Sequence, residues 1–254
     1  MSFSTRLLVV SVLLNSSLLS PAAKAQKQIT EDAQTWLGYF NQSRLSNKWG
    51  LWTDLHFRTK QNLVENPGIF IARAGATWYL NDKTKLTAGY AFINHFPADN
   101  HKNISQPEHR PWQQIQWHQN SSRFKLMQWV RLEQRFRRNI LNDNALADGY
   151  NFNWRVRYNI MLQFPLGRRP FEPGSLALAL NNESMLNFGK RIVNNTFDQN
   201  RAFAGFHYYV NKHDWLQVGY MNFFQQTASP GQYRMFHTAR VFFFHNIDWR
   251  RQPG

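Results

Sequence analysis

Along residues 151–164, polar and apolar side chains alternate, and this pattern limits what the chain can fold into more than any other feature. Arg155 and Arg157 fall on one side, with asparagines at neighbouring positions of the same phase, while Val156 and Tyr158 fall on the other side. A period of two residues places alternate side chains on opposite faces of a β-strand, whereas a helix repeats every ~3.6 residues. The pattern therefore predicts a long β-strand with one arginine-bearing polar face and one aromatic and aliphatic face.

The same alternation recurs between polar breaks from residue 34 to residue 247. Eleven segments show it, at 34–45, 48–60, 69–80, 84–95, 111–119, 130–137, 151–164, 176–183, 199–211, 215–226 and 233–247. Short breaks such as Asn81-Asp82 alternate with long ones, at 60–68, 96–110, 138–149 and 189–198. Short turns at one end and long loops at the other are typical of an up-and-down antiparallel barrel. Because single-chain bacterial membrane barrels have an even number of strands, we expect an all-β, antiparallel, up-and-down transmembrane β-barrel of about 12 strands, with about 10 as the alternative, and one strand missed near the N-terminus.

A soluble antiparallel sheet also alternates, so a secreted sandwich or a lipocalin-like barrel is the competing interpretation. Many of the segments are longer than ordinary strands of about 5–6 residues, and are long enough to cross a bilayer at a tilt. Trp and Tyr cluster near segment ends, as at Trp49 and Trp78, in the manner of interfacial aromatic girdles. Exposing one arginine to lipid at the bilayer midplane costs about 2–4 kcal/mol. We therefore expect the arginine face inside the barrel and the apolar face toward lipid.

Composition sets further limits on the class of protein. The mean hydropathy is −0.57, and no uncharged apolar run of about 20 residues follows the N-terminus, which argues against a helical membrane protein. The chain has no cysteine, which excludes a disulfide scaffold, a thiol nucleophile and a Cys-ligated zinc site.

The N-terminus has the pattern of a secretory signal peptide. Arg6 supplies a positive start, an apolar stretch follows at 7–19, and an A-x-A cleavage pattern lies at 23–25. We therefore expect a cleaved signal peptide at 1–25, export to the cell outer membrane, and a single β-barrel domain at 26–254.

Several short sequence motifs are spread over nearly the whole mature chain. The block FDQNR at 197–201 is the most specific of them, and LEQRF at 132–136 accompanies it. The others are WLGY at 36–39, RVRY at 155–158, PL at 165–166, NE at 182–183, AG at 204–205 and GYMN at 219–222. Together they resemble an uncharacterised outer-membrane β-barrel family, a domain of unknown function common in Gram-negative, Bacteroidetes-type bacteria. The resemblance implies the barrel and its location, and it implies no activity, ligand or catalytic residue.

Charged residues gather on the predicted lumen faces of neighbouring strands. They are Arg131, Glu133, Arg135, Arg155, Arg157, Glu183 and Arg201. One interpretation is a positively charged constriction that attracts small anions, because rings of arginine select anions in pores. The other, which we prefer, is a network of salt bridges and hydrogen bonds that plugs and stiffens the barrel, because charges need partners in a low-dielectric interior. Arginines outnumber glutamates in this set, so the anion hypothesis stays open.

No motif predicts a cofactor or a metal site. The nine histidines form no H-E-x-x-H motif and no pair at ligand spacing. His95, His101 and His109 lie in or beside the long break at 96–110, where solvated loop histidines are the ordinary explanation.

We expect a structural role, or permeation of small solutes including anions, with outer-membrane lipid and anionic solutes as partners. The alternative is a barrel-borne lipid-modifying enzyme of the phospholipase or lipid A deacylase type, which needs a serine and a histidine brought together. Ser184, His207 and His237 are the candidates for it, although they are separate and no G-x-S-x-G motif is present. The net charge of +15 raises nucleic acid as a partner, but the basic residues form no single stripe and the chain is expected to be exported, so we expect none.

Overall fold

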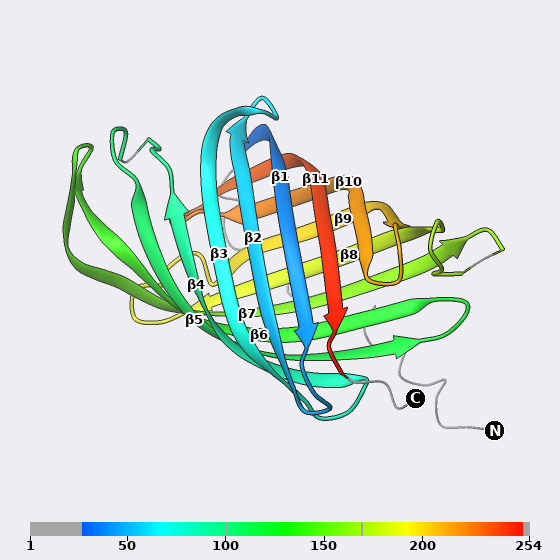
Figure 1. Cartoon of the computed structure of the whole chain (residues 1–254). Coiled ribbons are helices and arrows are strands. Elements are labelled where there is room, and N and C mark those ends of the chain that lie inside the picture. The colour runs from blue at the N-terminus through cyan, green and yellow to red at the C-terminus, as the bar shows by residue number, and fades with distance from the viewer. Residues whose placement is uncertain (1–26, 100, 169, 251–254) are drawn as a thin grey trace, which may run out of the picture.

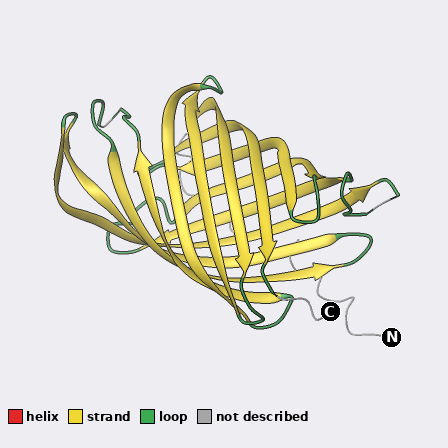
Figure 2. Ribbon diagram, viewed as in Figure 1, coloured by secondary structure: helices red, strands yellow, loops and turns green. Residues whose placement is uncertain are grey.

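Each of the eleven alternating segments forms one strand of a closed β-barrel (Figures 1 and 2). This computed structural model describes residues 27–99, 101–168 and 170–250, so the predicted signal peptide at 1–25 lies outside the described residues. The strands are β1 (Gln28–Arg44), β2 (Trp49–Gln61), β3 (Glu65–Tyr79), β4 (Thr84–His95), β5 (Gln106–Asn120), β6 (Lys125–Asn142), β7 (Ala145–Leu166), β8 (Leu176–Phe188), β9 (Phe197–Tyr209), β10 (Asp214–Gln226) and β11 (Gln232–Asp248). Among these residues, no helix is long and apolar enough to span a membrane.

The barrel closes through a parallel pair of strands. Every strand from β1 to β11 pairs antiparallel with its neighbours in sequence, and β1 then pairs parallel with β11, from Gln28↔Gln232 to Arg44↔Asp248. Figure 1 shows these two strands side by side with their arrows pointing the same way. The expectation of about 12 or about 10 strands, which rested on the even-number rule, was therefore wrong. A parallel closing pair permits an odd count, and the eleven segments need no further strand near the N-terminus.

Strands extend into the predicted long breaks, most of all at 138–149. β5 begins at Gln106, inside the predicted break at 96–110, and the β5–β6 pairing skips from His109 to Trp112. That interruption accommodates Pro111, which has no backbone N–H to donate to a neighbouring strand. The predicted break at 138–149 is instead a hairpin, in which β6 and β7 continue until only two residues connect them.

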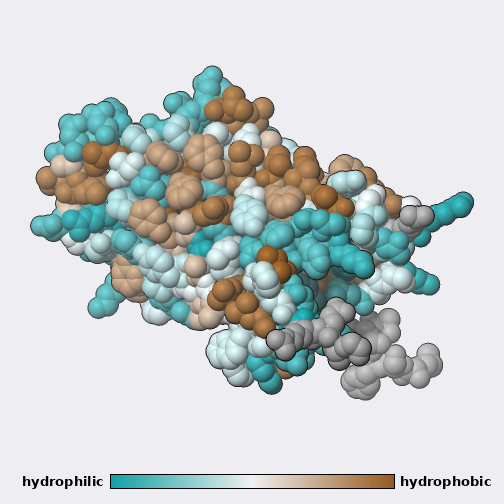
Figure 3. Space-filling view, in the orientation of Figure 1, coloured by the Kyte–Doolittle hydropathy of each residue, from teal (hydrophilic) through white to brown (hydrophobic). Residues whose placement is uncertain are grey.

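The two faces of each strand differ as the alternation requires. In β7, the side chains of Arg155 and Arg157 are buried inside the barrel, while Tyr158 is 40% exposed on its outer face. Large hydrophobic side chains are exposed on the outer face of the strands from β1 to β10, with the exception of β3; examples are Leu37, Leu51, Leu55, Leu86, Ile115, Leu180, Phe206 and Val218. On the side of the molecule drawn in Figure 3, they gather over the middle of the strands, and hydrophilic residues gather at the loop tips.

Aromatic rings inside the barrel pack against glycines on neighbouring strands. Gly75 of β3 lies opposite Gly89 of β4, and Trp112 of β5 packs against Gly89. A Cβ atom on Gly89 would lie 2.8 Å from Trp112 Cζ2 and 2.4 Å from the carbonyl oxygen of Ala74. Trp112 is fully buried as a result. These rings and a layer of charged side chains together fill the middle of the barrel.

Candidate functional site

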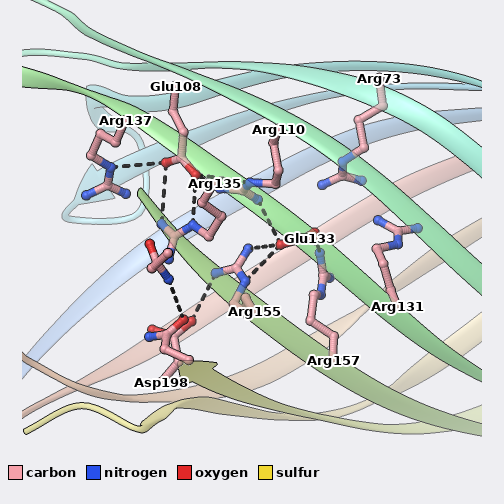
Figure 4. A network of polar contacts seen from close by, with 12 residues as sticks. Arg73, Glu108, Arg110, Arg131, Glu133, Arg135, Arg137, Arg155, Arg157 and Asp198 are labelled. Atoms are coloured by element: carbon pink, nitrogen blue, oxygen red, sulfur yellow. Dashed lines mark hydrogen bonds and ion pairs between the residues drawn. The ribbon is translucent and has the colours of Figure 1, made fainter. Parts of the chain in front are cut away.

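Glu133 lies at the centre of a network of ion pairs inside the barrel (Figure 4). Its carboxylate is 0% exposed and accepts hydrogen bonds from Arg155 Nε at 2.8 Å and Nη2 at 2.5 Å, and from Arg157 Nη1 at 2.7 Å. Arg110 Nη1 lies 3.4 Å from Oε2 of the same carboxylate. β6 and β7 pair in register at Glu133↔Arg155, so the local strand pairing itself brings these two side chains together.

Glu108 on β5 forms a second centre. Its carboxylate contacts Arg110 Nη2 at 2.6 Å, Arg135 Nε at 2.8 Å, Arg137 Nε at 3.0 Å and His95 Nε2 at 3.0 Å. Because Arg110 contacts both Glu108 and Glu133, it joins the two centres.

The network continues from β7 onto β8 and β9. Arg157 donates to Glu183 Oε1 from Nε at 2.7 Å, and Arg201 Nη1 donates to Glu183 Oε2 at 3.1 Å. Arg155 Nη1 lies 3.0 Å from Asp198 Oδ2. Each of the two β7 arginines therefore bridges Glu133 to a carboxylate on a later strand, and the ion pairs connect five neighbouring strands.

The structure places all seven charged residues proposed from the sequence inside the barrel, but not all in the same role. Six of them take part in the ion pairs just described, whereas Arg131 contacts no carboxylate of the described residues. Its Nε donates to Gln114 at 2.9 Å, and its guanidinium carbon lies 4.2 Å from the ring centroid of Trp112. Arg131 is thus held by an amide and by aromatic faces.

Sequence reasoning missed four members of the network: Glu108, Arg110, Arg137 and Asp198. Glu108 and Arg110 fall in the predicted break at 96–110, next to two prolines that usually interrupt strands. Glu108 and Arg110 are two residues apart, as Arg135 and Arg137 are. This spacing is the signal that could have extended the predicted strand at 111–119 toward the N-terminus. Asp198 belongs to the FDQNR motif, but the predicted strand began one residue after it.

A smaller ion-pair group lies beside the network on β2 and β3. Asp54 is 0% exposed, and its Oδ1 contacts Arg73 Nη1 at 2.9 Å and His56 Nε2 at 2.9 Å. Trp52 Nε1 donates to the other carboxylate oxygen at 2.6 Å. Trp52, Asp54 and His56 share the inner face of β2, and Arg73 lies opposite Asp54 on β3.

Two cavities of about 400 Å³ each lie inside the barrel. The loop-end cavity is lined by Lys60, His95 and Arg234, among others, and lies toward the long loops. The turn-end cavity is lined by Asn120 and Lys125, among others, and lies toward the short turns. The residues that line both cavities form the partition between them: Trp36, Arg58, Arg73, Arg157 and Arg201.

The Trp36 ring is the middle of the partition. Arg58 from β2 lies with its guanidinium carbon 3.5 Å from the centroid of the Trp36 ring, and Arg201 from β9 lies 4.7 Å from the same centroid. Attraction between a cation and an aromatic face holds both side chains against the ring. Both guanidinium groups therefore lie against the ring, where the linings of the two cavities meet.

Three guanidinium groups that line the turn-end cavity have no acidic partner among the described residues. Within the described ranges, no carboxylate oxygen lies within 4.0 Å of Arg58, Arg131 or Arg240. All three line the turn-end cavity, and the Nε atoms of Arg58 and Arg240 are buried without a hydrogen-bond partner. The positive charge that lines this cavity is therefore only partly neutralised by the described carboxylates.

The residues proposed for lipid-modifying catalysis are not brought together. Ser184 lies on the outer face of β8 and accepts a hydrogen bond from Asn200 at 2.8 Å. His207 lies inside the barrel on β9, with its Nε2 2.6 Å from the side chain of Gln217. His237 lies on the outer face of β11, a strand that does not neighbour β8.

The histidines at the long-loop end contact protein groups. His95 contacts Glu108, as described above, and His109 contacts the hydroxyl of Tyr90. Burial lowers the pKa of His101 in the loop between β4 and β5. No group of three or more potential ligand side chains that could hold a metal ion occurs in the part of the chain that the structure describes.

Comparison with known proteins places the chain among proteins of unknown function. A family model described as "Protein of unknown function (DUF2490)" matches residues 33–234, from β1 into β11. An uncharacterized protein of Methylorubrum extorquens is 27% identical over 240 residues, which make up 89% of this chain and 92% of that protein. No solved structure matches this chain.

Proposed function

This chain belongs to the DUF2490 family of proteins of unknown function, and from its own barrel we propose that it is an integral outer-membrane protein whose lumen conducts small anions. In this proposal the chain is exported, its outer face contacts lipid, and the long loops face the outside of the cell. Arg58 and Arg201 regulate passage between the two cavities by moving off the Trp36 ring.

The outer face supports the membrane location. Its strands carry exposed leucine, phenylalanine and valine side chains, and a soluble monomer rarely exposes an apolar patch larger than a few hundred Å². The strands contain 12 to 22 residues, and about 9–11 tilted residues cross a bilayer. Trp49 and Trp78 pack with their ring centroids 4.5 Å apart near the short turns, where an interfacial aromatic girdle belongs.

The observation that carries the proposal for anions is the set of unpaired guanidinium groups. Arg58, Arg131 and Arg240 face the lumen without a carboxylate partner, in a closed interior where an unpaired charge interacts strongly with a mobile counter-ion. Anions are attracted to such a site and cations are repelled, and the carboxylates that are present each contact at least one arginine.

The test is the reversal potential of the purified protein in a planar lipid bilayer under a KCl gradient. We expect a conductance that prefers chloride to potassium, and we expect Arg58→Gln to lower that preference. Arg123→Gln, on the exposed turn between β5 and β6, is the matched control and should change it little. A preference for potassium, or no current above that of the protein-free bilayer, would contradict anion conduction.

A further inference from the structure

The two cavities differ in chemistry although they are similar in volume. In the loop-end cavity, Arg135, Arg137 and Arg155 contact Glu108, Glu133 or Asp198. In the turn-end cavity, rings and methionines form much of the wall, and the two arginines that line only this cavity, Arg131 and Arg240, contact no acid of the described residues. We propose that the turn-end cavity is a binding site for an organic carboxylate with an apolar body.

Ring side chains fixed by their neighbours form the apolar wall of this cavity. Phe244 stacks between Phe40 and Trp215, with ring centroids 4.7 and 5.1 Å away and interplanar angles of 10° and 8°. Trp129 and Met161 line the cavity and are at most 9% exposed. Pockets for small organic ligands are mostly lined by such apolar and aromatic groups, with a few polar groups that fix the ligand's orientation. An apolar ligand body fits this wall.

The unpaired arginines supply the polar groups. The guanidinium carbon of Arg240 lies 4.1 Å from the Phe242 ring centroid and 4.7 Å from that of Phe203, and its Nε has no hydrogen-bond partner. Arg131 uses its Nε for Gln114, and its terminal nitrogens make no hydrogen bond to the described residues. A planar guanidinium binds a carboxylate through two parallel hydrogen bonds, so these donors match a carboxylate head group.

Further polar atoms in the lining of this cavity lack a partner. His207 Nδ1 and Asn159 Oδ1 are buried without a hydrogen-bond partner, and both residues line the same cavity. A buried polar atom without a partner costs free energy, so it is expected to find one in a ligand or in water. The cavity volume of about 400 Å³ lies in the usual range for small-molecule sites.

The experiment is calorimetric titration of the detergent-solubilised full chain with 2-naphthoate, corrected by a titration into detergent alone. We expect 2-naphthoate to bind, the neutral 2-naphthylmethanol to bind about tenfold or more weaker, and inorganic phosphate to give no heat at the same concentrations. Equal affinity of the acid and the alcohol, or displacement of the acid by phosphate, would overturn the proposal. This comparison needs no variant and holds even where a variant does not fold.

Two arginines on β11 provide matched variants for locating the site. Arg240 lines only the turn-end cavity and Arg234 only the loop-end cavity. We expect Arg240→Gln to weaken 2-naphthoate binding about tenfold or more, and Arg234→Gln to leave it unchanged. Equal effects of the two variants would place the ligand elsewhere. Binding is measured without a membrane current, so the two proposals can fail separately. If the protein binds 2-naphthoate but conducts no ions, the proposal of anion conduction is refuted and the proposal of the binding site stands.

Discussion

Replacing Glu133 with glutamine tests whether the ion-pair network stabilises the barrel. Glutamine keeps the volume of the side chain but loses its charge, and its NH2 group meets guanidinium groups that can only donate. Breaking a buried ion pair by removing one partner costs about 3–5 kcal/mol, because the remaining charge is uncompensated. Arg155 and Arg157 each keep a second carboxylate, Asp198 and Glu183. We therefore expect the free energy of unfolding to fall by about 3–4 kcal/mol, the lower half of that range.

The measurement is urea unfolding of the full chain in lipid vesicles, followed by tryptophan fluorescence and by the heat-dependent mobility of the folded barrel on gels. The midpoint should shift to lower urea concentration while the dependence on urea stays the same, because the surface exposed on unfolding does not change. Glu172→Gln, in the exposed loop between β7 and β8, is the matched control and should change the unfolding free energy by less than about 0.5 kcal/mol.

A loss of less than about 1 kcal/mol in Glu133→Gln would refute this reasoning. It would mean that the penalty for removing the charges from water already cancels their attraction, as it does in some buried ion pairs. The network would then specify which strands pair without adding to stability.

Three further substitutions test other parts of the structure by the same unfolding measurement. Gly89→Ala should cost about 1–3 kcal/mol, because the new methyl group meets the carbonyl of the neighbouring strand and the ring packed above it; an unchanged midpoint would contradict that packing. Val156→Arg should cost about 2–4 kcal/mol if the outer face of β7 contacts hydrocarbon, whereas Val64→Arg at an exposed turn should cost little, and equal costs would argue against lipid contact. In a double-mutant cycle, Arg201→Gln and Glu183→Gln should couple by at least about 0.5 kcal/mol, and strict additivity would contradict their ion pair.

Much of the fold could be predicted from local pattern alone. The phase of the alternation assigns Arg155 inward and Val156 outward, because that assignment depends only on backbone geometry within one strand. The parallel pairing of β1 with β11 could not be predicted in this way. It depends on which edges meet after ten other pairings have formed, and nothing in the sequence of β1 distinguishes a parallel neighbour from an antiparallel one.

The candidate site was predictable in part for the same reason. Residues in the middle of clear strands, such as Glu133 and Arg157, could be assigned to the lumen from their phase. Their partners could not, because the tilt and register of several strands decide that Arg155 reaches Asp198 on β9. Membership of a family of unknown function agrees with the resemblance drawn from the motifs, while the distribution of that family among Bacteroidetes-type bacteria stays a prediction.

The three arginines of the turn-end cavity that lack acidic partners show how the proposed attraction of anions is compatible with a stable barrel. An arginine paired with a carboxylate is stabilised, but the carboxylate cancels the electric field that the arginine would exert on more distant groups. Arg155 between Glu133 and Asp198 is an example. An arginine stacked on a ring, as Arg58 is on Trp36, is also stabilised, but the ring carries no net charge. Its positive field therefore extends into the cavity, where a mobile anion is the remaining group that can neutralise it. Under the proposed function, the ion pairs therefore hold the strands together, and the arginines stacked on rings leave positive charge for the proposed ligand.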